Sequence, residues 1–134
     1  MSRKRVAVLI SGRGSNMAAL IEAAKDKDYP AEIALVVSNK ADAGGLAVAR
    51  AAGIRTEVID DTIFGKDRAA FDAALQDVLV THRIEIVCLA GFMRLLTSDF
   101  VRRWDGRILN IHPALLPAFK GLDTHRRALE AGVK

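Results

Sequence analysis

Cysteine, proline and aromatic residues are all scarce in this chain of 134 residues, and each scarcity excludes a class of protein. A single cysteine, Cys88, excludes an internal disulfide framework. Because Cys88 lies within the apolar stretch 86–89, we expect a buried structural thiol rather than a nucleophile. Three prolines and ten glycines are too few for a low-complexity or collagen-like chain.

Long hydrophobic runs are also absent from the sequence. No apolar run approaches the ~20 residues that cross a bilayer. The basic start, residues 1–5, is followed by a short apolar stretch that breaks at Ser11 without the cleavage pattern of a secretory signal. The sequence therefore predicts a cytoplasmic protein without a membrane partner.

A concentrated tract of positive charge is missing as well. The net charge is +4, and the basic residues occur in short clusters with few aromatic residues among them. This pattern gives little support to nucleic-acid binding, so we expect no nucleic-acid partner. Small anionic substrates suit the same charge.

What the chain does contain is a regular alternation of apolar strands and amphipathic helices. We expect strands over 5–10, 31–37, 55–59, 84–89 and from 107 to the proline at 113, and helices over 17–25, 46–52, 67–81, 98–104 and about 124–131. Residues 60–66 are expected to form a loop, Ser98 to cap the helix that follows it, and His82 to be solvated at a helix end. The alternation predicts an α/β domain with a parallel sheet, whose strand-ending loops share one edge.

A glycine-containing loop, Ser11–Asn16, joins the first strand to the first helix. Glycines permit close backbone approach, and a helix N-terminus presents free N–H groups, so the loop suits a phosphate. Met17 occupies the third glycine position of a dinucleotide fingerprint, and the Gly-Lys-Ser/Thr of a P-loop is absent. NAD and ATP are therefore disfavoured, and a sugar phosphate fits better. The alternative is a tight turn capped by Ser15 or Asn16.

Two polar residues, Asn110 and His112, interrupt the last apolar strand. Residues at i and i+2 share a strand face, so an amide and an imidazole project side by side near a strand end. Ligands of open parallel sheets bind at such ends. The alternative is that Asn110 caps a loop and His112 is a satisfied core histidine.

Three motifs together resemble the glycinamide ribonucleotide (GAR) formyltransferases. They are Ser11–Asn16, Leu89–Arg94, and Asn110–Pro113 with the following 115–117 and 121–125. The Asn-x-His-Pro strand is shared with methionyl-tRNA formyltransferase and formyltetrahydrofolate deformylase, whereas the Ser-Gly-x-Gly-Ser-Asn opening singles out the GAR enzymes. A deformylase or tRNA formyltransferase relative, and an inactive nucleotide- or folate-binding fragment, remain alternatives.

The resemblance implies a Rossmann-like open parallel sheet with helices on both faces. It implies transfer of a formyl group from 10-formyltetrahydrofolate to the amine of 5'-phosphoribosylglycinamide in de novo purine biosynthesis, with no metal. The implied phosphate contacts are Gly14, Ser15 and Asn16. The implied folate contacts are Arg68, Met93, Arg94, Leu95, Leu96 and Asn110.

The catalytic residues implied by the resemblance are Asn110 and His112. An amide donor suits the oxyanion formed when an amine attacks a formyl carbon, and an imidazole suits the proton transfers. No Ser or Cys is placed as a covalent carrier, so transfer is expected to be direct.

The family extends beyond Lys134, and its catalytic Asp, which pairs with the His, lies in that continuation. We therefore expect residues 1–134 to be a single N-terminal formyltransferase domain without that Asp. Activity of the isolated chain is left open, and its uncovered sheet edge is expected to favour self-association.

Overall fold

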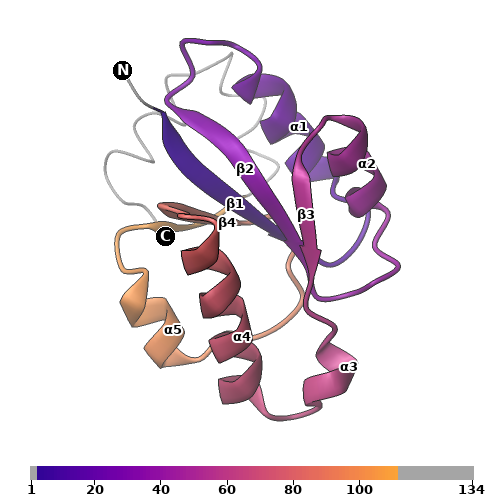
Figure 1. The fold of residues 1–134 in the computed structure, drawn as a ribbon, viewed down its shortest axis with the longest axis vertical. Coiled ribbons are helices and arrows are strands. Elements are labelled where there is room, and N and C mark those ends of the chain that lie inside the picture. The colour runs from indigo at the N-terminus through magenta and orange to yellow at the C-terminus, as the bar shows by residue number, and fades with distance from the viewer. Residues whose placement is uncertain (1–2, 112–134) are drawn as a thin grey trace.

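The computed structural model describes residues 3–111, which form a five-stranded, entirely parallel sheet (Figure 1). The strand order is β3-β2-β1-β4-β5. The strands are β1 (Lys4–Ile10), β2 (Ala31–Ser38), β3 (Arg55–Val58), β4 (Ile86–Leu89) and β5 (Ile108–Asn110). His112 and the helix expected near 124–131 lie outside the described residues.

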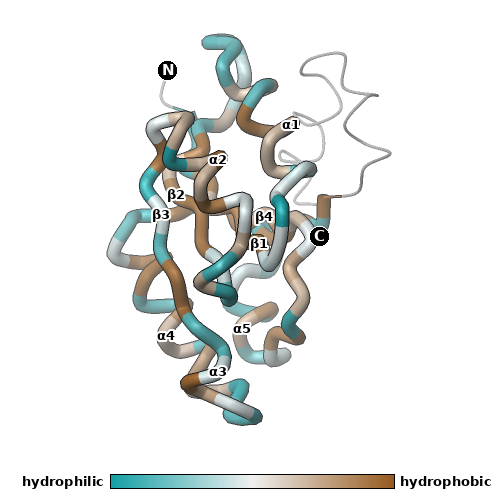
Figure 2. Tube along the Cα trace, turned by 90° about the vertical axis from the view of Figure 1, so that its right-hand side faces the viewer, coloured by the Kyte–Doolittle hydropathy of each residue, from teal (hydrophilic) through white to brown (hydrophobic). Residues whose placement is uncertain are grey.

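The central strand β1 is buried on both faces, which explains its unbroken apolar sequence. Val6, Val8 and Ile10 face one hydrophobic cluster, whereas Ala7 and Leu9 face the other. Each of these five side chains is at most 1% exposed. Figure 2 shows the hydrophobic colour concentrated in the strands at the centre of the fold.

Helices cover both faces of the sheet, as expected for the Rossmann-like class (Figure 1). Helices α1 (Ser15–Ala24) and α2 (Gly45–Ala51) pack on one face, and α4 (Arg68–Thr81) and α5 (Ser98–Arg103) pack on the other. The short helix α3 (Asp61–Phe64) precedes α4. None of the helices within residues 3–111 is long and apolar enough to span a membrane.

Three local expectations about helices are wrong. The segment expected to be a loop contains α3, because the Asp60 carboxylate accepts hydrogen bonds from the Thr62 N–H (2.9 Å) and hydroxyl (2.7 Å). Helix α5 is capped by Thr97 rather than Ser98, because Thr97 Oγ1 accepts a hydrogen bond from the Phe100 N–H at 3.2 Å. The helix ends at Arg103, one residue earlier than expected.

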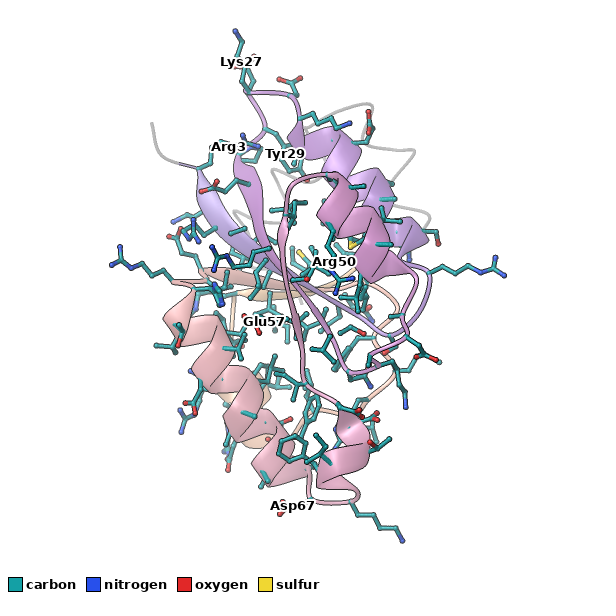
Figure 3. All side chains as sticks on the ribbon, turned by 45° about the vertical axis from the view of Figure 1, so that its right-hand side comes forward. Arg3, Lys27, Tyr29, Arg50, Glu57 and Asp67 are labelled. Carbon is teal, nitrogen blue, oxygen red and sulfur yellow. The ribbon has the colours of Figure 1, made fainter. Side chains whose placement is uncertain are left out.

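The expectation that His82 is solvated is also wrong. Its side chain is only 15% exposed, and its Nε2 lies 3.4 Å from Oε2 of Glu57. Glu57, labelled in Figure 3, comes from β3, and His82 is the C-cap residue of α4. The Arg5 guanidinium also donates to the His82 carbonyl at 3.0 and 3.2 Å, so this helix end is tied to the sheet.

Candidate active site

The strand order reverses direction at β1. The chain leaves β1 toward β2 on one side and later returns to pair β4 on the other. The loops after β1 and β4 therefore both lie at the carboxyl edge of the sheet, where open α/β folds bind ligands. These two loops contain the expected phosphate turn and four of the six expected folate contacts, Met93, Arg94, Leu95 and Leu96.

The phosphate turn begins α1 with a glycine rather than with a polar cap. Gly14 is the N-cap residue in the left-handed region (φ 73°, ψ 32°), and no side chain caps the helix. The alternative in which Ser15 or Asn16 caps the turn is therefore wrong. The first turn of α1 contains no acidic residue, and its first residue, Ser15, is exposed, so no anionic side chain of this turn accompanies the N–H groups at the positive end of the helix dipole.

The loop is held in place by close backbone contact with the start of α2. The Gly45 N–H donates to the Gly12 carbonyl at 2.9 Å. A Cβ on Gly14 would lie 3.1 Å from the Gly45 Cα and 2.9 Å from the Met17 Cε. Glycine at position 14 thus satisfies both a positive φ and a close approach between two segments.

The loop after β4, residues 90–97, contains four of the expected folate contacts and is called the folate loop below. Some of its side chains pack into the core and others are exposed to solvent. Phe92 and Leu96 pack against the hydrophobic cluster beneath α4 and α5. Met93 and Leu95 are 80% and 74% exposed. The loop therefore exposes two large apolar side chains at the carboxyl edge of the sheet, a suitable surface for a flat aromatic ligand.

Arg94 points from this loop toward the connection between α3 and α4. Its guanidinium carbon lies 4.2 Å from the centroid of the Phe71 ring, and its Nη2 lies 3.5 Å from the Gly65 carbonyl oxygen. Arg68 is exposed at the first position of α4, three residues after Gly65. The structure thus brings the segments of the two expected arginines to the same side of the molecule.

Asn110 is the last residue of β5 and is exposed. It pairs in register with Leu89, the last residue of β4, so its side chain belongs to the same carboxyl edge as the two loops. His112 lies outside the described residues. The position of Asn110 is the one that the strand-end argument requires.

A buried polar network was missed by the sequence reasoning. The Ser11 Oγ lies 2.8 Å from the Met93 N and 2.5 Å from the Asn39 Oδ1, and the Asn39 Nδ2 lies 2.9 Å from the Asp61 Oδ2. Asn39 is fully buried. The available signal was the pair Ser38-Asn39 directly after the apolar run 33–37, since polar residues at that position are either exposed or specifically hydrogen-bonded.

Cys88 is a structural residue, as its apolar neighbours indicated. Its thiol is 2% exposed, and burial raises its pKa to about 12. A neutral thiol of this kind is a poor nucleophile at neutral pH. We therefore assign the Cys88 thiol no role in the chemistry proposed for the carboxyl edge of the sheet.

The glycine turn after β1, the loop after β4 and the polar end of β5 lie together at the carboxyl edge of a Rossmann-like parallel sheet, the class of fold that binds ligands at this edge. A family model described as formyl transferase matches residues 4–134, and the chain belongs to this family.

Similar proteins carry more specific names. The crystal structure of phosphoribosylglycinamide formyltransferase from Brucella melitensis is 53% identical with a TM-score of 0.80, and the match covers 99% of this chain and 69% of that one. Phosphoribosylglycinamide formyltransferase of Haemophilus influenzae is 46% identical over 129 residues, 96% of this chain and 60% of its own length. The human trifunctional purine biosynthetic protein adenosine-3 is 53% identical over 131 residues, 98% of this chain and 13% of its own length. The chain thus spans only part of these relatives.

Proposed function

We propose that the protein containing this chain transfers the formyl group of 10-formyltetrahydrofolate to the amine of GAR, a step of de novo purine biosynthesis. The observation that carries this proposal is the placement of a phosphate-type turn and an apolar ligand loop on either side of the β1–β4 reversal. The similarity to phosphoribosylglycinamide formyltransferases supports it.

Each substrate has a chemically suitable surface. The GAR phosphate binds the N–H groups of the Gly14–Asn16 turn at the positive end of α1. The folate ring binds against Met93 and Leu95, beside Leu96, and its carboxylates lie toward the positive charges of Arg68 and Arg94.

The reaction joins the amine nitrogen to the formyl carbon and then breaks the bond from that carbon to the folate nitrogen. The tetrahedral intermediate carries a negative oxygen, to which the Asn110 amide donates a hydrogen bond. The amine loses a proton and the folate nitrogen gains one, and His112 transfers it. No covalent enzyme intermediate is required.

Replacing Ser15 with Asp tests the phosphate site. The variant Ser15→Asp places a carboxylate in the first turn of α1, where it stabilises the helix by about 0.3–1 kcal/mol. The same charge repels a bound phosphate. Calorimetry on the complete gene product is expected to show GAR binding weakened by at least about tenfold, without a loss of thermal stability.

Ala19→Asp is the matched control, because Ala19 is exposed one turn further along the same helix. It adds the same charge away from the helix N-terminus and is expected to bind GAR nearly as the unmutated protein does. If Ser15→Asp binds GAR as tightly as Ala19→Asp, the phosphate site is elsewhere.

An activity assay distinguishes transfer from deformylation. With 10-formyltetrahydrofolate alone, the protein is expected to release little formate. With GAR added, formyl-GAR and tetrahydrofolate are expected in equal amounts. Equal rates of formate release with and without GAR would identify a deformylase instead.

A further inference from the structure

One hydroxyl group bridges the two proposed substrate loops. Ser11 directly follows β1 and precedes the phosphate turn, and Met93 belongs to the folate loop after β4. The backbone N–H of Met93 donates to the Ser11 Oγ at 2.8 Å, across a sequence separation of 82 residues. This hydrogen bond joins the loops that follow β1 and β4, the neighbouring strands at which the strand order reverses.

Asn39 and Asp61 determine that the Ser11 oxygen is the acceptor of this bond. The Asp61 carboxylate only accepts hydrogen bonds, so the Asn39 Nδ2, 2.9 Å away, donates to it. The Asn39 Oδ1 must then face Ser11 as an acceptor, and the Ser11 hydroxyl donates to it at 2.5 Å. The lone pairs of the Ser11 oxygen are left to accept from Met93.

Asn39 itself has little freedom to move. It is fully buried, and its backbone carbonyl accepts from the Asp61 N–H at 3.2 Å. The Lys40 ammonium neutralises the other oxygen of Asp61, at 3.1 Å. The side chains of Asp61, Asn39 and Ser11 are therefore paired with one another, whereas the hydrogen bond from Met93 to Ser11 at the end of this network is solvent-exposed and can open locally.

We propose that Ser11 is a positioning residue that couples the binding of GAR to the binding of folate. This inference rests on the proposed function of the two loops. A phosphate that orders the turn after Ser11 also holds the Ser11 oxygen in place as the acceptor for the Met93 N–H. Folate then binds to a loop that is already ordered. By linkage, folate must strengthen GAR binding by the same factor.

The test measures GAR affinity by calorimetry on the complete gene product, with and without saturating tetrahydrofolate, which has no formyl group to transfer. In the unmutated protein, tetrahydrofolate is expected to tighten GAR binding by about fivefold, the scale of one hydrogen bond. In Ser11→Ala this factor is expected to fall to about one. Ser11→Thr retains the hydroxyl and is expected to restore it.

Ser38→Ala is the matched control for the loss of a strand-end hydroxyl. Ser38 is also buried at the end of a strand, but its hydroxyl bonds only to the N–H and carbonyl of Lys40, within its own turn. Its removal is expected to leave the coupling factor unchanged. Loss of coupling in Ser38→Ala as well would overturn the specific role of Ser11.

Amide hydrogen exchange provides a second readout that needs no ligand. The Met93 amide is expected to exchange about two- to tenfold faster in Ser11→Ala than in the unmutated protein and Ser11→Thr. An unchanged Met93 exchange rate, or an unchanged coupling factor in Ser11→Ala, overturns the proposal. Failure of the unmutated protein to bind GAR would instead overturn the proposed function, and the coupling with it.

Discussion

At the scale of single residues, buried polar groups in this fold act on backbone atoms of other segments. Asp72 is 5% exposed within α4, and its Oδ2 accepts a hydrogen bond from the Thr97 N–H at 2.7 Å. Thr97 is the cap of α5, so one buried carboxylate fixes where that helix begins. The buried Asn39 likewise holds the Ser11 hydroxyl in place by a hydrogen bond. In both cases the side chain positions another residue rather than contacting solvent.

Cys88 gives a prediction at this scale. Because burial raises the pKa of its thiol to about 12, almost no thiolate is present in the folded protein at pH 8. Iodoacetamide is therefore expected to leave native Cys88 unmodified over hours, and to modify it within minutes in denaturing urea. Mass spectrometry provides the measurement, and rapid labelling of the native protein would contradict the assignment of a buried thiol.

The sequence predicted which residues are buried better than it predicted which residues they contact. A cysteine between Ile, Val and Leu was correctly predicted to be buried. The roles of Ser11 and Asn39 were not predicted, because they depend on which loops the sheet brings together. The contact between His82 and Glu57 was not predicted for the same reason, because the two residues lie on different elements.

At the scale of elements, the strands were predicted because four of the five lie within clearly apolar runs. The helix α3 was missed because its four residues are too few for a helical periodicity to be visible. The cap of α5 was misplaced by one residue because Thr97 and Ser98 are both good caps, and only the position of the Phe100 N–H decides between them.

The start of α2 gives a prediction at this scale. A Cβ on Gly45 would lie 2.6 Å from the Ile10 Cδ1 and 3.2 Å from the carbonyl oxygens of Gly12 and Arg13. Gly45→Ala is therefore expected to lower the free energy of unfolding by about 1–3 kcal/mol, as measured in urea.

The neighbouring glycine is the control for this substitution. A Cβ on Gly44 would have only the Arg13 Cα within 4 Å, at 3.9 Å, and its φ of −62° suits any residue. Gly44→Ala is expected to change the free energy of unfolding by less than about 0.5 kcal/mol. Equal effects of the two substitutions would mean that the contact between the phosphate loop and α2 is unimportant for stability.

At the scale of the whole molecule, the sheet separates two hydrophobic layers. One layer contains residues of α1 and α2, the other contains residues of α4 and α5, and β1 contributes alternate side chains to each. The carboxyl edge of the sheet, where both layers end, carries the proposed site. The alternating pattern of the sequence predicted these layers, because helices that follow parallel strands must cover the faces of the sheet.

The separation into layers predicts how the effects of substitutions combine. Ile21 lies in the layer of α1 and Ile59 in the layer of α4, and both side chains are buried. Ile21→Val and Ile59→Val are each expected to lower the free energy of unfolding by about 0.5–1.5 kcal/mol. Because the sheet lies between them, the double variant is expected to show the sum, within about 0.5 kcal/mol.

A pair within one layer is the comparison. The rings of Phe64 and Phe71 meet edge to face, with centroids 5.8 Å apart. Phe64→Leu and Phe71→Leu each remove this contact, so their double variant is expected to differ from the sum by about 0.5–1.5 kcal/mol. Urea unfolding of all six variants measures both coupling energies. A cross-layer coupling as large as the aromatic one would show that the sheet transmits packing changes between its faces, and the two layers would then have to be treated as one core.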